Sequence, residues 1–104
     1  MWVYWRCSGS DDLSSVSDLS PRGLFIETSD RRPLGATVKI DFLVQEGQIR
    51  AEAIVRHVKP GTGLGLQLTA LAEPDRPRLT ALMTRLCRLP QFRSRLYLEN
   101  RLSG

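Results

Sequence analysis

Residues 17–26 most constrain what this chain can fold into, because a polar turn, a glycine and an apolar run follow one another directly. Asp18 and Ser20 are short polar side chains that bond to nearby backbone and favour turns. Pro21 restricts its own backbone and favours an extended residue before it. Gly23 is free to take a positive φ. We therefore predict that a strand kinks here and continues as a second strand.

The same kink carries three functional groups at a spacing of two residues. They are the carboxylate of Asp18, the hydroxyl of Ser20 and the guanidinium of Arg22. On one rim they could hold a small polar ligand, because a carboxylate accepts N–H groups and arginine pairs with anionic groups. In the alternative interpretation, Asp18 and Ser20 only shape the turn. Both interpretations stay open at this point.

Several short runs alternate apolar and polar residues, which is the pattern of half-buried strands. In one of them, Val38, Ile40 and Phe42 alternate with polar neighbours. Clusters of glycine, proline, serine and aspartate separate the runs and indicate turns. The predicted strands cover residues 2–7, 13–19, 24–28, 37–44, 49–58 and 64–69.

A helix is predicted to follow the strands. Asp75 and Pro77 mark its start, because aspartate is a good N-cap and proline is tolerated in the first turn. Apolar residues then recur at spacings of three and four up to Leu89, forming one stripe that packs on the strands or on a second subunit. Pro90 is expected to end this helix, and residues 91–102 to form a shorter one with apolar residues on several sides.

The length of 104 residues suits one domain, with the strands in residues 1–72 and the helix with a basic tail in residues 73–104. A hydrophobic share of 41% and a charged share of 25% allow a single core. Cys7 and Cys87 match no metal-ligand spacing and are expected to be free thiols of a reducing compartment. We find no signal peptide and no apolar run of the roughly 20 residues that span a bilayer, so we expect a cytoplasmic location.

Positive charge is concentrated late in the chain. Residues 75–104 contain seven arginines and two acidic residues, a net charge of +5, while the whole chain carries +4. Such a segment can meet nucleic acid, an anionic membrane or an acidic protein, or it can be a solvated helix face. Trp2, Tyr4 and Trp5 could stack on bases, but packing explains aromatic residues in a first strand well.

The residue types present give little support to catalysis. His57 is the only histidine, whereas a hydrolase needs a nucleophile with a positioned base and a catalytic zinc usually needs three protein ligands. The glycine-rich stretch at residues 61–65 lacks the lysine of a phosphate-binding loop, and it covers a predicted hairpin turn and the start of the next strand rather than the start of a helix. We therefore predict that the protein is not an enzyme and uses no cofactor or metal, and that His57 is a strand residue.

Three stretches together resemble the PilZ domain family. They are the motif Asp-x-Ser-x-x-Gly followed by Leu-Phe-Ile at residues 18–26, and the runs at residues 53–60 and 63–68. The resemblance covers about residues 2–89. It implies a mainly β fold, a small antiparallel six-stranded β-barrel with a C-terminal α-helix. The strand order comes from this resemblance, because periodicity does not specify it.

In that family the motif works with an upstream Arg-x-x-x-Arg arm to bind cyclic di-GMP. The resemblance implies ligand-binding roles for Asp18, Ser20 and Gly23, and Arg22 fills an unconstrained position where it could add a phosphate contact. A carboxylate can accept the N–H groups of a guanine edge, and arginine can pair with phosphate or stack on the base. Arg6 is the only arginine before the motif, so we include it among the candidate ligand-binding residues.

The arginine arm is the part of the family pattern that this sequence does not match. No residue stands four positions from Arg6 as a partner, and Arg31 and Arg32 follow the motif in a different loop. Losing two charge-assisted hydrogen bonds of ~1.5–3 kcal/mol each would weaken binding by on the order of 100-fold or more. Either the arm has been lost, or the chain is a fragment whose arm lies outside it.

We therefore predict a PilZ-type signalling module with two alternative modes of action. In the first, it receives cyclic di-GMP through Asp18, Ser20, Arg22 and Gly23, aided by Arg6. In the second, it is a ligand-independent adaptor whose C-terminal helix contacts a protein partner, with a homodimer as one option. A nucleic-acid-binding barrel is the third and least favoured choice.

Overall fold

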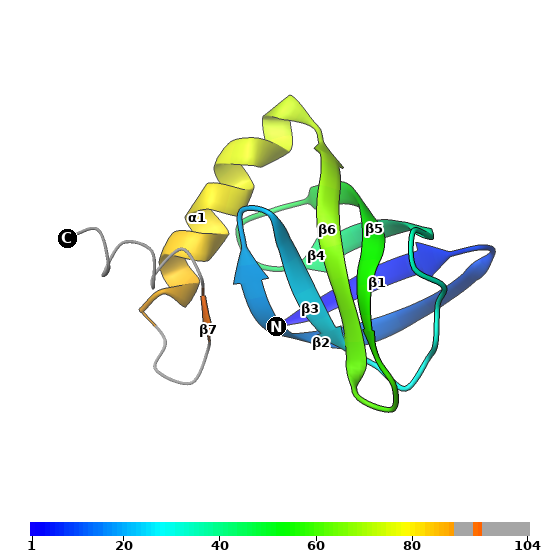
Figure 1. Cartoon of the computed structure of the whole chain (residues 1–104). Helices are drawn as coiled ribbons and strands as arrows, with labels where there is room; N and C mark the ends of the chain where they lie inside the picture. The colour runs from blue at the N-terminus through cyan, green and yellow to red at the C-terminus, as the bar shows by residue number, and fades with distance from the viewer. Residues whose placement is uncertain (89–92, 95–104) are drawn as a thin grey trace.

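The computed structural model describes residues 1–88 and 93–94 (Figure 1). A 3-10 turn, Glu73–Asp75, leads from the last long strand into the helix α1 (Arg76–Leu86). The strands are β1 (Trp2–Cys7), β2 (Ser10–Ser20), β3 (Gly23–Glu27), β4 (Thr37–Leu43), β5 (Ile49–Lys59), β6 (Gly63–Leu71) and the two-residue β7 (Arg93–Ser94).

The first six strands form a closed antiparallel barrel, which confirms the predicted mainly β fold with one C-terminal helix. Their order around the barrel is β1-β4-β5-β6-β3-β2, and β1 pairs with β2 to complete the circle. Closure leaves few unpaired strand edges, which would otherwise invite aggregation. β7 is an addition to this pattern, because it pairs in parallel with β2 at Asp18 and Leu19.

The core is built from alternate residues of each strand, as the sequence pattern predicted. In β4, Val38, Ile40 and Phe42 are buried, while in β1 the buried Trp5 alternates with the exposed Trp2. Burying apolar side chains contributes roughly 1.5–3 kcal/mol each for residues of this size. The remaining barrel core residues are Val3, Cys7, Val16, Leu19, Leu24, Ile26, Ile49, Ala51, Ala53, Val55, Leu64 and Leu66.

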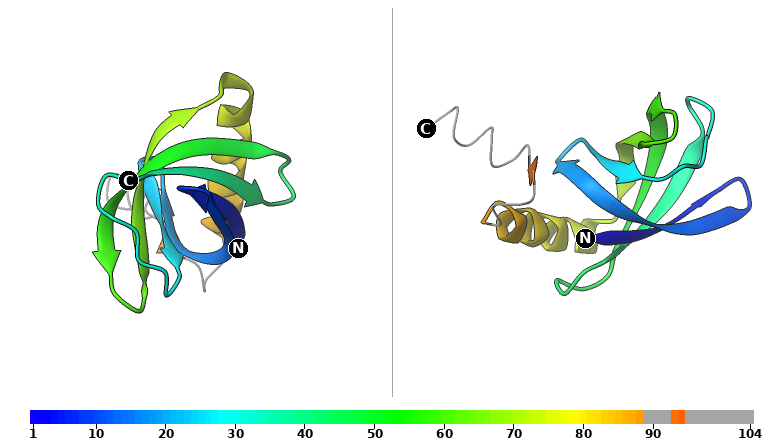
Figure 2. Two further views of the ribbon diagram at one scale, coloured as in Figure 1. Left: turned by 90° about the vertical axis from the view of Figure 1, so that its right-hand side faces the viewer. Right: turned by 90° about the horizontal axis from the view of Figure 1, so that it is seen from below.

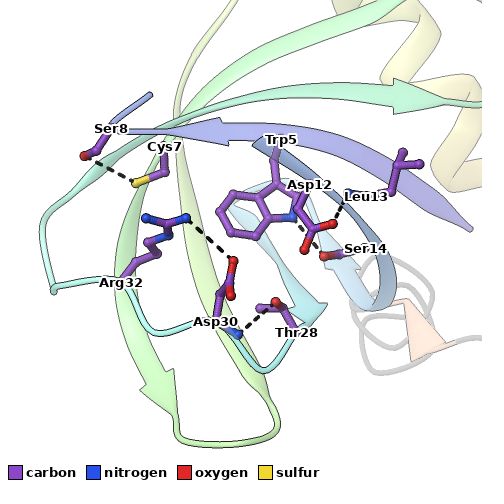
Figure 3. Close-up of polar contacts among 9 residues, drawn as sticks. All are labelled: Trp5, Cys7, Ser8, Asp12, Leu13, Ser14, Thr28, Asp30 and Arg32. Atoms are coloured by element: carbon purple, nitrogen blue, oxygen red, sulfur yellow. Dashed lines mark hydrogen bonds and ion pairs between the residues drawn. The ribbon is translucent and has the colours of Figure 1, made fainter. Parts of the chain in front are cut away.

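Trp5 is the largest fully buried side chain among the described residues, and it ties a loop to the barrel (Figure 3). Its indole N–H donates to Ser14 Oγ on β2 at 2.8 Å. The guanidinium carbon of Arg32 lies 5.6 Å from the centroid of the Trp5 ring, and Arg32 also forms an ion pair with Asp30 at 3.6 Å. A cation over an indole face is favourable, so these contacts hold the loop between β3 and β4 against the barrel.

The apolar stripe of α1 packs on the barrel, the first of the two predicted alternatives. Its buried residues are Leu79, Leu82, Met83 and Leu86, which belong to the same apolar cluster as the strand residues. The helix lies at the end of the barrel opposite the turn between β1 and β2 (Figures 1 and 2). Because the stripe is buried within the chain, it is not available to a protein partner.

Two carboxylates anchor the helix to the hairpin between β4 and β5. Asp75 is buried and accepts the backbone N–H of Arg50 at 3.0 Å, and it pairs with Arg78 at 3.3 Å. Its side chain does not cap α1, contrary to the sequence prediction, because it accepts the backbone N–H of Arg50 instead. At the other end, Arg85 donates from two nitrogens to Glu46, and this hydrogen bonding holds the pKa of Glu46 below its usual value.

The remaining differences from the sequence prediction concern element ends. The turn predicted over residues 8–12 is shorter, because Ser8 and Gly9 take positive φ and β2 begins at Ser10. The helix predicted to reach Leu89 ends at Leu86. The predicted break at Pro90 lies outside the described residues, as does most of the predicted helix at 91–102, in which residues 93–94 instead form β7.

Within the described part of the chain, no helix is long and apolar enough to cross a membrane.

Candidate ligand groove

Ser20 holds the turn between β2 and β3 together from within. Its hydroxyl oxygen accepts the backbone N–H groups of Arg22 and Gly23, and its O–H donates to the carbonyl of Gly23, all at 3.3 Å. Ser20 is buried, as a side chain that serves the backbone of a turn should be. The predicted kink therefore exists, and its serine fixes the position of Arg22 at the rim.

Gly23 is required by a close approach rather than by its backbone conformation. Its φ is not positive, so the sequence-based reason for this glycine was wrong. A Cβ atom at this position would lie 2.1 Å from the carbonyl oxygen of Leu66 on β6. In addition, the carbonyl of Arg22 accepts the N–H of Leu68 at 2.7 Å. The turn is thus docked directly on the β6 backbone.

A row of cross-strand neighbours runs from this motif across the outside of the barrel. Asp18 on β2 is opposite Phe25 on β3. Gly65 on β6 then lies between Phe25 and His57 of β5. Neighbouring strands are about 4.8 Å apart, so the row extends over roughly 14 Å. It lines up a carboxylate, an aromatic ring and an imidazole on one surface.

Glycines make the floor of this surface flat. A Cβ atom on Gly63 would lie 2.6 Å from the ring of Phe25, so the ring lies directly on the β6 backbone. A Cβ atom on Gly65 would be 3.1 Å from Cβ of His57. The two strands therefore approach closely at Gly65. A floor of backbone and one half-buried aromatic ring suits the stacking of a planar base.

The row lies in a groove with a volume of about 890 Å³. Cationic side chains border it on two sides, Arg22 from the β2–β3 turn and both Arg56 and Lys59 from β5. All three are exposed. The groove thus combines the carboxylates of Asp18 and Glu27 with three positive charges, which fits a ligand carrying both N–H donors and phosphate groups.

Phe25, Arg56, His57 and Lys59 are among the groove residues that sequence reasoning missed. His57 was predicted only as a strand residue, which it is, and it is exposed at the end of β5. The available signal was a cluster of basic residues beside the turn that joins β5 to β6. Only the strand order, which places β6 between β3 and β5, brings this cluster beside the motif.

The structure does not bring Arg6 to the groove. Arg6 lies on β1, opposite Asp11 on β2 and Lys39 on β4, and lines a separate hollow of about 520 Å³. The reason is the barrel closure, because β1 is separated from β6 by two strands in either direction. Asp18, Ser20, Arg22 and Gly23 all line the groove, so the motif and Arg6 belong to different surfaces.

Among residues 1–88 and 93–94 there is no group of three or more histidine, cysteine or acidic side chains that could hold a metal ion. In the described part of the basic C-terminal segment, Arg93 of β7 pairs through its backbone with Asp18 of β2.

A family model described as the PilZ domain matches residues 3–85 of this chain. The match includes the motif, both hairpins around the groove and nearly all of α1. Among curated proteins and among solved structures, no significant match is found.

Proposed function

This chain belongs to the PilZ domain family of signalling modules, and we propose that it acts by binding cyclic di-GMP in the groove over β2, β3, β6 and β5. The observation that carries the proposal is the row from Asp18 through Phe25 to His57. Arg22 borders this row on one side, and Arg56 and Lys59 border it on the other. Its length of roughly 14 Å leaves room for a dinucleotide rather than for a single base.

Each part of the ligand has a matching group in the groove. The carboxylate of Asp18 is suited to accept the N–H groups of a guanine edge, as this residue type does in base recognition. Phe25 offers a ring on which a base can stack, with roughly 1–3 kcal/mol expected from such a contact. Arg22, Arg56 and Lys59 supply the positive charge that two phosphates need.

In our proposal, two cations of β5 take over the phosphate contacts of the arginine arm that the family pattern includes. Arg56 and Lys59 belong to the barrel itself, so their position is set by the pairing of β5 with β6. In our proposal they neutralise the phosphates from the side opposite Arg22. The affinity then depends on residues that the motif alone does not reveal.

Calorimetric titration of cyclic di-GMP into the full chain tests the proposal. We expect binding that Asp18→Ala weakens by roughly 10- to 100-fold, because a charge-assisted hydrogen bond contributes about 1.5–3 kcal/mol. Arg56→Ala should weaken it by a similar factor. Arg76→Ala is the matched control, because Arg76 is exposed on α1, pairs only with Glu73 among the described residues and lines no part of the groove.

Two outcomes would contradict the proposal. One is a folded wild-type chain that shows no binding at millimolar ligand. The other is binding that Asp18→Ala and Arg56→Ala leave unchanged. Cyclic di-AMP serves as the ligand control, since its adenine edge presents a different donor and acceptor pattern to Asp18. Arg6→Ala tests the sequence-based expectation that Arg6 binds the ligand. Because Arg6 lies outside the groove, we expect this change to leave binding unaltered.

The adaptor alternative needs a different surface from the one first expected. The apolar stripe of α1 is buried against the barrel, with Leu82 and Leu86 at most 2% exposed. Charged residues at these two positions would therefore unfold the chain rather than release a partner. Any protein contact of the described residues has to use another face, and the outside of β1 offers one.

A further inference from the structure

The outward side of β1 carries a cluster of large apolar side chains that the groove does not use. Trp2 is 55% exposed, Leu13 on β2 is 53% exposed and Leu43 on β4 is 54% exposed. Trp2 is directly opposite Leu43, and the half-buried Tyr4 is directly opposite Leu13. These four residues form one continuous patch, which we call the β1 face.

Such a patch is unusual for the outside of a barrel. The outward positions of a sheet that faces water are normally polar, and a continuous exposed apolar area marks an interaction site. Three of the four large hydrophobic residues exposed in the described part of the chain lie in the β1 face. The fourth, Leu34, lies in the loop before β4 and is far from Leu43 at the end of that strand.

The contact that the β1 face can make is of a defined kind. β1 is hydrogen-bonded to β2 on one side and to β4 on the other, so its edges cannot accept a further strand. A partner has to lie on the side chains, face to face. Tryptophan, tyrosine and leucine at the centre of such a contact bury large areas, and tryptophan and tyrosine are enriched among the residues that dominate binding energy.

The charges around the β1 face select the partner. Asp11 on β2 and Lys39 on β4 lie on opposite sides of Arg6 of β1, and Asp41 pairs with Arg50 at 3.5 Å. Both signs are present, so the face does not match a nucleic acid or an anionic membrane, which offer one sign only. A second copy can match this row, because a two-fold axis parallel to β1 brings β2 of one copy over β4 of the other. Asp11 of each copy, which also accepts the hydroxyl of Tyr4, then faces the partner's Lys39. The two Arg6 side chains meet at the axis, between the two Asp11 carboxylates.

We propose that this protein self-associates through the β1 face as a symmetric dimer. Closed two-fold dimers are the commonest assemblies of soluble proteins. β1 and β6 lie on opposite sides of the barrel, separated by two strands in either direction. A dimer through β1 therefore leaves both ligand grooves open on its outer sides. The result is a module with two outward-facing sites.

Sedimentation velocity of the full chain over a range of concentrations tests the dimer. Leu43→Lys should raise the dissociation constant at least tenfold, since it buries a charge in an apolar contact, and Leu13→Lys should act in the same direction. Leu34→Lys is the matched control, because Leu34 is 67% exposed yet lies outside the β1 face. Circular dichroism of each variant confirms that the barrel is folded.

A wild-type chain that remains monomeric at the highest soluble concentration would overturn the proposal. A dimer that Leu43→Lys and Leu13→Lys leave intact would overturn it as well. Titration of the monomer with vesicles of anionic phospholipid covers the other occupant, and binding that Leu43→Lys abolishes would assign the β1 face to a membrane instead.

Charge reversal tests the two-fold arrangement. Asp11→Lys and Lys39→Asp should each weaken the dimer severalfold, because each change places like charges opposite one another across the interface. The double variant restores opposite charges and also keeps one acidic and one basic neighbour beside Arg6. Tyr4→Phe is the control for the hydrogen bond from Tyr4 to Asp11, which Asp11→Lys also removes. Recovery of dimer formation in the double variant supports the arrangement, and failure to recover while Tyr4→Phe still dimerises overturns it.

Discussion

The ligand groove and the β1 face are two outer surfaces of the same barrel, and they are built in opposite ways. On β6, Gly63 and Gly65 leave the backbone bare, so Phe25 lies flat and a hollow forms. On β1, Trp2 projects outward beside Leu43, so large apolar side chains cover the backbone there. The inward residues of both regions belong to one core. The barrel thus constrains only alternate positions, and the outward positions are free to specify separate functions.

The largest expected effect on stability comes from replacing Gly23, on the groove side of the barrel. Gly23→Ala places a Cβ atom 2.1 Å from the backbone oxygen of Leu66, which cannot move without separating β3 from β6. We expect a loss of at least about 3 kcal/mol in the free energy of unfolding, at the upper end of overpacking effects. Denaturant unfolding of the purified variant measures it.

Gly9→Ala is the control for this change. Gly9 lies in the turn between β1 and β2, has φ +81° and has no atom within 4 Å of an added Cβ. Only backbone strain of about 1–2 kcal/mol is expected there. A Gly23→Ala variant that is as stable as Gly9→Ala would show that the contact of the turn with β6 is not essential.

A smaller effect on stability is expected from replacing the two buried serines, one beneath each surface. Ser20→Ala removes the hydrogen bonds that hold the β2–β3 turn, whereas Ser14→Ala leaves the indole N–H of Trp5 without its partner beneath the β1 side. Each change should destabilise the fold by about 1–3 kcal/mol. Only Ser20→Ala should also weaken cyclic di-GMP binding in calorimetry, since Arg22 depends on that turn. Equal effects of both variants on binding would contradict the separation.

The ion pair of Glu46 with Arg85 should make the stability of the fold depend on pH without affecting either surface. The pKa of Glu46 is lowered in the folded chain, mainly by its hydrogen bonds from Arg85. Its contribution to stability is therefore fully present above the unfolded pKa and is lost as pH falls through the folded pKa. Glu46→Gln should lower the free energy of unfolding by about 1–2 kcal/mol at neutral pH.

Thermal unfolding between acidic and neutral pH measures this difference. The wild type should lose its advantage over Glu46→Gln as the solution becomes acidic. Ligand affinity and dimer affinity at neutral pH should match those of the wild type, because Glu46 lies in neither surface. A constant stability difference at all pH values would contradict the role of the ion pair.

The smallest effect is expected from salt, which should weaken the charged ligand groove more than the apolar β1 face. Raising the salt concentration from about 0.05 M to about 0.5 M shortens the range of electrostatic interactions severalfold. Cyclic di-GMP binding should weaken roughly tenfold or less, because Arg22, Arg56 and Lys59 are exposed. The dimer should change less than the ligand affinity, since Trp2 and Leu43 form the centre of its contact. Titration and sedimentation at both salt concentrations compare the two directly.

Much of the fold was predictable from local pattern. The alternation at Val38, Ile40 and Phe42 predicted which residues are buried, and the spacing of Leu79 and Leu82 predicted the buried side of α1. These predictions succeed because period-two and period-three-or-four patterns are local properties of a strand and a helix. The cap at Asp75 failed for the opposite reason, since its competing partner Arg50 is distant in sequence.

The candidate site was predictable only in part. Asp18, Ser20, Arg22 and Gly23 were identified because they are adjacent in the chain, and all of them line the groove. Arg56 and Lys59 were not, because they are distant from the motif in sequence and only the strand order, with β6 between β3 and β5, brings them beside it. The same limit applies to Arg6, which is close to the motif in sequence but lies on the other surface.

The sequence by itself determined the strands, the kink, the helix and the family, because each depends on neighbouring residues or on a short motif. The tertiary structure alone decided what Gly23 is for, which cations join Asp18 and which side of the barrel Trp2 occupies. Those features depend on the order in which strands pair, and pairing between distant strands depends on the packing of the whole core. The outward side chains then follow the strand that carries them.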